Sequence, residues 1–446
     1  MFKALYVLYK KDENNYNCPR IIMKSVFKKL IVDFQERNFV DIIKRDVEIP
    51  SNTKKIVSLI GIRRCGKTYM LFYLIQQLRK IINNKNIIYI NFEDDRLYPL
   101  TLKDLDLLLE SYYELYPQKR GEKIYLFLDE VQNIKCWELY VRRIHDAENI
   151  HLYITGSSSK LLSSEIATSL RGRTITFEIF PFSFKEYVRY KGIEVNLFSS
   201  RSVSYLKNAF NTYLVDGGFA ETFDESADIQ KRILKDYLDL IIYKDIIDRY
   251  AIKNHSLLKH LIKHLFVNMG TLVSFNKLYN DYKSLGYKVG KDTLFDYISY
   301  LQEVFALFTV PIFRNSVKEE LRHPKKLFAI DNGFKKLFDI SMSFDFSKLY
   351  ENIAYLHLRR KTPEVYYYKK KQEVDLYCIL DKECLINVSY DISDADTLKR
   401  ETNALIEGMD YFSLKSAYLI TSEQERELHF GDKTISIIPM WKWLLD

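Results

Sequence analysis

The chain has 446 residues, which is too long for one hydrophobic core and predicts roughly three domains. Hydrophobic residues make up 47% and charged residues 28% of the sequence, as in globular proteins, and no run of apolar residues is long enough to predict a membrane span. The net charge of +8 is compatible with a nucleic-acid partner but does not require one, because a small excess of basic residues can be spread over a large surface.

Cysteine usage and the first residues favour a reducing, cytoplasmic compartment. The five cysteines are odd in number and scattered, without a C-x-x-C pair. The first residues lack the basic, apolar and small-residue pattern of a signal peptide. The first predicted element is an amphipathic helix from Met23 to Glu36. We interpret residues 1–22 as an extension that is dispensable or an upstream artefact.

The clearest motif lies between Gly61 and Thr68, where GIRRCGKT matches the spacing G-x-x-x-x-G-K-[ST]. The apolar residues 55–60 before it predict a buried parallel strand, and residues 69–78 predict a helix. In this context the backbone N–H groups of the loop and the helix N-terminus bind a polyphosphate. The alternative, a glycine-rich turn that matches by chance, does not account for the flanking strand and helix.

Individual residues of this phosphate loop have expected roles. Lys67 is expected to reach the β- and γ-phosphates, and the Thr68 hydroxyl is expected to ligate Mg²⁺. The residues expected to bind the nucleotide are Gly61, Ile62, Arg63, Arg64, Cys65, Gly66, Lys67, Thr68 and Tyr69.

A second motif ends the strand predicted from the apolar residues 124–128, where Asp129 and Glu130 follow. This arrangement is typical of a Walker B strand. Asp129 is expected to hold Mg²⁺ through its water shell. Glu130 is expected to polarise the attacking water as a general base, so Glu130 and Lys67 are catalytic candidates.

A further strand, residues 151–155, ends in a small polar segment. Thr155 and Ser157 are candidates to sense the γ-phosphate from a neighbouring strand tip. The alternative is that residues 157–159 cap the helix that follows. Both interpretations stay open, because one hydroxyl can cap while another senses.

These motifs, together with the segment LRGRTITFEIFPFSFKEY at residues 170–187, resemble a prokaryotic, archaeal-type AAA-family ATPase. In that family an ATPase domain precedes a C-terminal domain of unknown function, and the resemblance covers nearly everything from Met23 on. It implies an ASCE-type P-loop fold, with ATP and Mg²⁺ as cofactors and ATP hydrolysis as the activity. It also implies that Arg171 and Arg173 stabilise phosphate charge, in cis or from a neighbouring subunit. The alternative for both arginines is pairing with carboxylates.

The middle of the chain predicts a helical lid at residues 196–255 and a winged helix at residues 256–340. Three predicted helices precede a hairpin of residues 306–310 and 326–330, which is the order of a helix-turn-helix with a wing. The third helix is a poor base reader, but the wing is basic enough for phosphate contacts. Its basic residues are Arg314, Lys318, Arg322, Lys325 and Lys326. DNA binding and a purely protein-binding scaffold are equally compatible with this pattern.

The C-terminal residues 341–446 resemble the PD-(D/E)xK nuclease-like fold found at the end of this ATPase family. Glu351 on a helix and Asp375 on a strand match its first two metal-binding positions. Asn387 and Ser389 stand where the resemblance implies Glu and Lys. A neutral amide is a weak ligand and serine lacks the positive charge, so we expect a degenerate site without efficient cleavage.

The expected fold class is therefore α/β: a P-loop NTPase sheet of the AAA type, with a helical lid, a winged helix and a nuclease-like domain. The ATPase domain is assigned to residues 23–195. The leading functional hypothesis is Mg²⁺-dependent ATP hydrolysis that moves the other domains on DNA or a protein partner. The alternatives are a nucleotide-dependent switch with little turnover and an ATP-dependent nuclease. No membrane association is expected, and the motifs are compatible with an oligomer without implying a hexameric ring.

Overall fold

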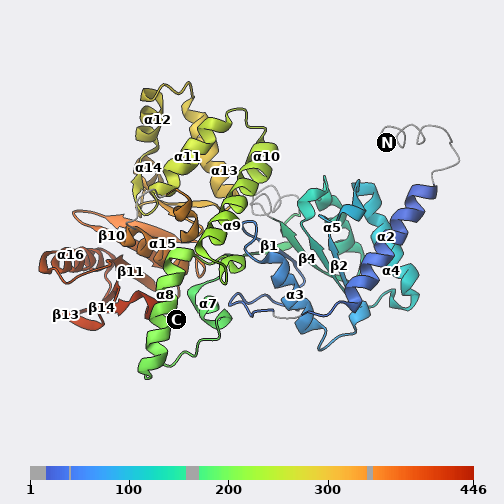
Figure 1. The fold of residues 1–446 in the computed structure, drawn as a ribbon, viewed down its shortest axis with the longest axis horizontal. Helices are drawn as coiled ribbons and strands as arrows, with labels where there is room; N and C mark the ends of the chain where they lie inside the picture. The colour runs from blue at the N-terminus through green and yellow to red at the C-terminus, as the bar shows by residue number, and fades with distance from the viewer. Residues whose placement is uncertain (1–16, 40–41, 157–169, 339–344) are drawn as a thin grey trace. The chain divides into compact units, whose positions relative to one another are not determined.

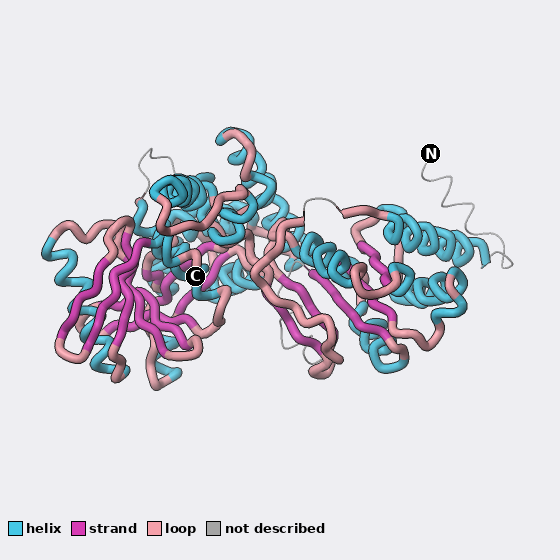
Figure 2. Tube along the Cα trace, turned by 90° about the horizontal axis from the view of Figure 1, so that it is seen from below, coloured by secondary structure: helices cyan, strands magenta, loops and turns pink. Residues whose placement is uncertain are grey.

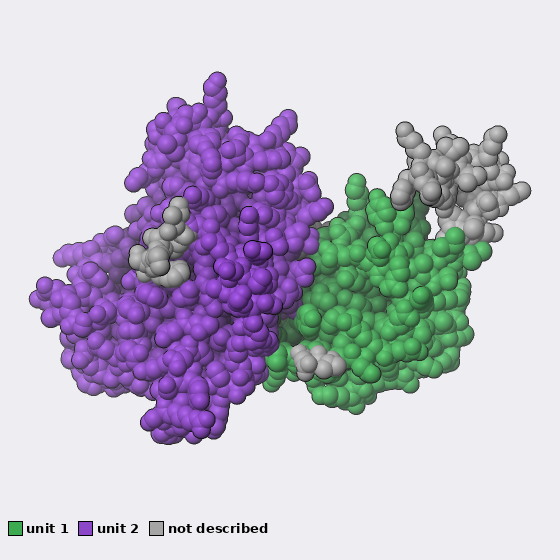
Figure 3. Space-filling view, viewed as in Figure 1, with its two compact units in different colours: residues 1–60, 67–177 green, residues 61–66, 178–446 purple. Residues whose placement is uncertain are grey.

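The computed structural model describes residues 17–39, 42–156, 170–338 and 345–446. The chain divides into two compact units, one of residues 1–60 with 67–177 and one of residues 61–66 with 178–446 (Figure 3). The predicted phosphate loop therefore groups with the second unit, whereas the strand before it and the helix after it group with the first. Within the described ranges, every helix is too short or too polar to cross a membrane.

The first unit is built on a five-stranded sheet with the strand order β2-β3-β4-β1-β5. The pairs β2–β3, β3–β4 and β4–β1 are parallel. The central strands carry buried apolar residues on both faces of the sheet. This is what continuous apolar runs predict for a parallel sheet that is covered by helices. This confirms the expected α/β class. The strands are β1 Ile56–Ile60, β2 Ile87–Asn91, β3 Ile124–Asp129, β4 Ile150–Gly156 and β5 Thr174–Glu178.

Four α-helices are described in this unit, and short 3₁₀ turns connect several elements. The first helix begins at Asn17 and ends at Glu36, so it starts upstream of the predicted Met23. It packs on α4, where Lys24 and Lys28 form ion pairs with Glu114. The helices are α2 Asn17–Glu36, α3 Lys67–Leu78, α4 Asp106–Leu115 and α5 Trp137–Ala147.

The second unit begins with helices, as predicted. One long helical segment combines α9, the π-helical turn η8 and α10 without a break. Three further helices follow in the predicted order. The helices are α7 Phe184–Tyr190, α8 Ser200–Asp216, α9 Ala227–Leu240, η8 Ile241–Ile247, α10 Asp248–Tyr250, α11 His255–Val267, α12 Phe275–Ser284 and α13 Lys291–Glu303.

A small antiparallel sheet has the order β6-β8-β7, with β6 between α11 and α12 in the chain and the other two strands after α13. It contains the predicted hairpin, in which Phe308 lies opposite Phe328. Its strands are β6 Leu272–Val273, β7 Leu307–Val310 and β8 Lys325–Ala329, and α14 Val317–Arg322 lies between β7 and β8 in the chain. The three helices and the two hairpin strands occur in the predicted order, whereas β6 and α14 were not predicted. The interpretation of this part as a winged helix stays a prediction.

The C-terminal part is a six-stranded mixed sheet, with the order β13-β14-β12-β11-β10-β9, and helices packed against it (Figures 1 and 2). Its apolar core lies between α16 and the sheet and includes Leu405 and Met409. The strands are β9 Val365–Lys369, β10 Glu373–Ile379, β11 Glu383–Val388, β12 Ser416–Thr421, β13 Arg426–Phe430 and β14 Lys433–Pro439. The helices are α15 Phe346–Arg359, α16 Ala395–Phe412 and α17 Met440–Trp443.

Candidate functional site

The carboxylate of Asp129 is the centre of a polar cluster at the end of β3 in the first unit. It is fully buried and accepts hydrogen bonds from Thr68 Oγ1 at 2.7 Å and from Tyr89 OH at 2.7 Å. Thr155 Oγ1 also donates to it. Tyr89 and Thr155 lie on β2 and β4, the two neighbours of β3, so the parallel sheet brings these groups to one edge. Thr68 comes from the first turn of α3.

Burial and hydrogen bonding act on Asp129 in opposite directions. Burial raises the pKa of its carboxyl above the ordinary value, and the hydrogen bonds from Thr155, Thr68 and Tyr89 oppose this rise. Its oxygen atoms and the Thr68 hydroxyl are the hard donors that Mg²⁺ prefers. These two residues therefore fit a Mg²⁺ ion and would hold it at this strand end. A pocket of about 400 Å³ opens beside Thr68 and Tyr89.

Lys67 and Glu130 adjoin Thr68 and Asp129 in the chain, and their charged groups lie close together. Both residues are buried, and Lys67 Nζ lies 4.0 Å from Glu130 Oε1. Glu130 has a φ of 54°, a left-handed backbone conformation that is uncommon for a non-glycine residue and is often found at functional sites. Its backbone N–H donates to Thr155 Oγ1 at 2.9 Å. The acidic pair is therefore held in a defined conformation at the strand end.

Thr155 connects the two acidic residues. Its hydroxyl accepts from Glu130 N and donates its single hydrogen to Asp129. In this arrangement the hydroxyl orients the acidic pair, so contact with a γ-phosphate as a donor requires that the bond to Asp129 be exchanged. The other predicted sensor, Ser157, lies outside the described residues.

The two predicted arginines differ in their surroundings. Arg173 forms a two-pronged ion pair with Asp146 on α5, with distances of 2.8 Å and 2.9 Å. This pair lowers the pKa of the Asp146 carboxyl. For Arg173 the structure thus shows the carboxylate pairing that was the alternative to a phosphate contact. Arg171 is exposed and has a φ of 50°.

The phosphate loop itself has a backbone that requires glycine at its first position. Gly61 has a φ of 150°, and a Cβ atom there would lie 2.1 Å from the carbonyl oxygen of Ile179. Gly66 has a φ of 100°, and Arg64 adopts a φ of 66°. The first motif glycine therefore allows a close approach of two backbone segments in the second unit.

The C-terminal candidate site contains a residue that the sequence interpretation placed elsewhere. Glu351 and Asp375 come together as predicted from the nuclease-like resemblance, and Glu373 joins them. All three carboxylates surround Lys326 of β8, whose Nζ lies 2.7 Å from Asp375, 3.1 Å from Glu351 and 3.2 Å from Glu373. The interpretation of Lys326 as a wing residue that contacts phosphate is therefore wrong, because its side chain is buried among carboxylates.

The charges of this cluster compensate one another. Burial alone lowers the pKa of Lys326, but the carboxylates of Asp375, Glu351 and Glu373 raise it above its usual value. For Glu351, burial raises the pKa to about 8 despite the nearby ammonium group. The positive charge that Ser389 cannot supply thus comes from another strand, and it occupies the space between the carboxylates.

Asn387 and Ser389 support the structure around this cluster. Asn387 Oδ1 accepts from the backbone N–H of Asp375 at 3.1 Å, and its amide donates to Glu401 at 2.7 Å. Ser389 Oγ donates to the carbonyl oxygen of Asp391 at 3.1 Å. A pocket of about 490 Å³ beside the carboxylates is lined by Glu351, Glu373, Asp375, Ser389, Arg400 and Glu401, among others.

Sequence reasoning missed Lys326, Glu373 and Glu401 at this site. Glu373 could have been predicted from the sequence, because residues two apart on a strand face the same side and Asp375 was already a candidate metal ligand. No local signal identified Lys326, which comes from a separate sheet.

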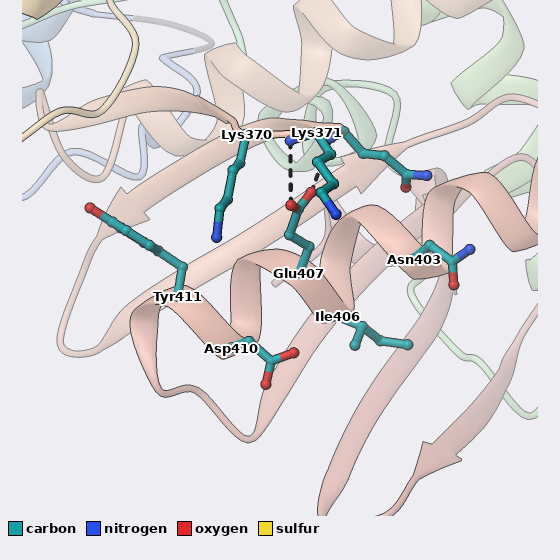
Figure 4. A pocket seen from close by; sticks show the side chains of 8 residues that line it. Lys370, Lys371, Asn403, Ile406, Glu407, Asp410 and Tyr411 are labelled. Carbon is teal, nitrogen blue, oxygen red and sulfur yellow. Dashed lines mark hydrogen bonds between the residues drawn. The ribbon is translucent and has the colours of Figure 1, made fainter.

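A neighbouring pocket of about 510 Å³ lies between α16 and the turn that joins β9 to β10 (Figure 4). The Glu407 carboxylate accepts hydrogen bonds from the backbone N–H groups of Lys371 and Gln372 at 3.3 Å and 3.0 Å. This contact holds the turn, which explains Glu407 as a structural residue.

Comparison with known proteins identifies the class of the chain. A family model described as an AAA domain matches residues 53–188, which include both nucleotide motifs. A second model, a domain of unknown function (DUF8612), matches residues 207–340. The chain therefore contains a P-loop ATPase domain of the AAA type.

Two curated relatives align with almost the whole chain. An uncharacterized protein of Methanocaldococcus jannaschii is 34% identical over 439 residues, which are 95% of this chain and 96% of the relative. An uncharacterized protein of Haemophilus influenzae is 27% identical over 431 residues, 95% of this chain and 99% of the relative. The chain belongs to the family of the Methanocaldococcus protein.

Among solved structures, the Walker-type ATPase of Pyrococcus abyssi is similar to this chain at 15% identity and a TM-score of 0.39. The match covers 64% of this chain and 90% of the solved one.

Proposed function

We propose that the chain binds ATP at Gly61–Thr68 and hydrolyses it with the acidic pair at the end of β3. The observation that carries this proposal is the hydrogen bond between the Thr68 hydroxyl and the buried Asp129 carboxylate. It joins the last residue of the phosphate loop to the first residue of the Walker B pair, as a Mg²⁺–nucleotide site requires.

The residues have separate roles in the proposed reaction. Thr68 and Asp129 would hold Mg²⁺, which supplies charge neutralisation for the β- and γ-phosphates. Lys67, which lies 4.0 Å from Glu130 here, would turn to the phosphates when ATP binds. Glu130 would then be released to orient and deprotonate the attacking water. Thr155 keeps both carboxylates aligned through its two hydrogen bonds.

Two substitutions separate binding from hydrolysis. Lys67→Ala is expected to abolish ATP binding, because the motif loses its phosphate-binding ammonium group. Glu130→Gln is expected to retain binding and to lower turnover by about 10²-fold or more, as removal of a general base does. Calorimetric titration with ATP and a phosphate-release assay measure the two effects. Unchanged turnover in both variants would refute the proposal.

We further propose that nucleotide state moves elements of the second unit on DNA or a protein partner. Support comes from the helices α11 to α13, the β7–β8 hairpin and the exposed basic residues near α14, Lys318 and Arg322. Capture experiments with Glu130→Gln and ATP would identify the trapped partner. A nucleotide switch with little turnover is the alternative, and the measured ATPase rate distinguishes it.

Nuclease activity is the third candidate function, and the position of Lys326 argues against it. Its ammonium group lies within 3.2 Å of all three carboxylates that would bind a metal ion. A divalent cation would have to displace this buried charge.

A further inference from the structure

The phosphate loop is anchored in the second unit through its two arginines. Arg63 Nε donates to Asp245 Oδ2 at 2.8 Å, and Asp245 lies on the π-helical turn η8. Arg64 Nη1 lies 3.4 Å from Glu221, and its guanidinium lies over the ring of Tyr237 at 5.7 Å. Consecutive loop residues thus contact the 3₁₀ turn Ala220–Thr222 and the continuous helical segment of α9 and η8.

The two contacts differ in expected strength. The Arg64–Glu221 pair is half exposed on both sides, and exposed pairs of this kind contribute little. The Asp245 side chain is only 7% exposed and the Arg63 side chain 22%. A charge pair this well buried is screened much less by solvent and salt. Of these two contacts, the one between Arg63 and Asp245 is therefore expected to be the stronger.

The surroundings of Asp245 also distinguish it from an ordinary surface carboxylate. The π-helical turn places it among the buried residues Ile241, Ile242 and Ile246. Single π-helical turns inside α-helices are frequent at functional sites. Here the carboxylate is directed to a residue inside the proposed ATP-binding motif.

The chemistry of ATP creates competition for Arg63. A triphosphate carries several negative charges, and guanidinium groups prefer phosphate oxygens that accept two parallel hydrogen bonds. We propose that the carboxylate of Asp245 competes with bound nucleotide for Arg63 and thereby couples ATP occupancy to the η8 segment. Asp245 is thus a positioning residue that regulates the proposed ATP site. The inference rests on the proposed function.

Thermodynamic reciprocity fixes the sign of the effect. If ATP weakens the contact between Arg63 and Asp245, then loss of the contact strengthens ATP binding by the same factor. Asp245→Asn retains the shape and an acceptor oxygen but removes the competing charge. We expect it to tighten binding of a non-hydrolysable ATP analogue by about 5-fold or more, the lower end of the range for coupled sites.

A matched control and a double variant make this test specific. Asp248 lies on the same helical segment and pairs with Lys244 at 3.7 Å, but it is 61% exposed. Asp248→Asn removes the same charge and is expected to leave the affinity unchanged. In an Arg63→Gln background, Asp245→Asn is expected to have no effect. Calorimetric titration of the full chain with the analogue and Mg²⁺ measures all five proteins.

The wild-type chain offers a second readout that does not depend on variant stability. Binding of the analogue should increase amide hydrogen exchange in residues 241–247, and this increase should be lost in Arg63→Gln. Unchanged exchange overturns the coupling. The coupling is also overturned if Asp245→Asn leaves the affinity for the analogue unchanged or weakens it. It is likewise overturned if Asp245→Asn tightens binding equally in the Arg63→Gln background. Failure of the wild-type chain to bind ATP refutes the proposed function together with this inference, whereas the other outcomes refute only the inference.

Discussion

At the scale of single residues, Lys326 shows how a buried charge is retained when its partners exceed it in number. Three carboxylates face one ammonium group, and the burial of Glu351 raises the pKa of its carboxyl to about 8. A proton held at Glu351 near neutral pH therefore reduces the excess negative charge of this cluster from two to one. Release of this proton would leave two negative charges of the cluster without a compensating positive charge.

The stability of the chain should consequently fall as pH rises through this range. The pKa of Glu351 lies near 4.5 when unfolded and about 8 when folded, so the folded state binds more protons between these values. The stabilisation is complete below the lower value and is lost toward the upper one. Asp331, with a pKa raised to about 6 by burial, contributes with the same sign.

Glu351→Gln isolates the larger contribution. The variant mimics the protonated carboxyl, so we expect its unfolding free energy to fall less steeply between pH 5 and 8 than that of the wild type. The difference should exceed about 1 kcal/mol, because the shift from 4.5 to about 8 spans several pKa units and each unit corresponds to about 1.4 kcal/mol. Denaturant unfolding across pH measures it. The exposed Glu425, which pairs with Lys442, provides a control in Glu425→Gln, and equal slopes in all three proteins would contradict the assignment.

At the scale of elements, the sequence predicted the order of helices and strands along the chain better than the contacts between them. The strands β1 to β4 and the helices from α8 to α13 could be predicted from the pattern of apolar residues. This pattern is a property of the local sequence and does not depend on knowing the tertiary contacts. Thr155 was placed correctly at a strand tip, yet its bond to Asp129 depends on the lateral order of strands. Lys326 was misassigned for the same reason, since its carboxylate partners lie on α15 and β10. The π-helical turn η8 gave no sequence signal.

The close approach at Gly61 gives an element-level prediction. Gly61→Ala introduces a Cβ atom 2.1 Å from a backbone oxygen, which cannot move without displacing its own segment. We expect loss of ATP binding and destabilisation of about 2–3 kcal/mol, as for strained backbone positions. Thermal unfolding and nucleotide titration measure both effects.

Gly192 provides the matched control. It also has a positive φ, 62°, but a Cβ atom there would meet nothing within 4 Å. Gly192→Ala should therefore cost about 1 kcal/mol for the backbone conformation alone and leave ATP binding intact. Similar behaviour of both variants would show that the contact at Gly61 is unimportant.

At the scale of the whole molecule, the distribution of exposed basic residues bears on the partner. Lys318 and Arg322 on α14 are exposed, whereas Lys326 is committed to an internal cluster. The same helix carries Glu319 and Glu320, so any DNA contact here is a local phosphate contact and not a broad basic surface.

For a DNA partner, binding should weaken with salt. Removal of Lys318 and Arg322 by substitution with Gln should lower the slope of log affinity against log salt by about 2, since each phosphate contact contributes roughly 0.9. Fluorescence anisotropy with duplex DNA at several salt concentrations measures this slope. Glu319→Gln, which removes an exposed negative charge from α14, should not lower it. Absent or salt-independent DNA binding would leave the protein partner as the working hypothesis.

The grouping of Gly61–Gly66 with the second unit has a consequence for the design of chimeric proteins. The polypeptide passes between the units at residues 60/61, 66/67 and 177/178. A gene fusion or recombination event at the last junction alone would transfer Asp245 without the motif arginine that it contacts. A chimera joined at this position would therefore keep both residues of this contact only if its two parents carry the same pair.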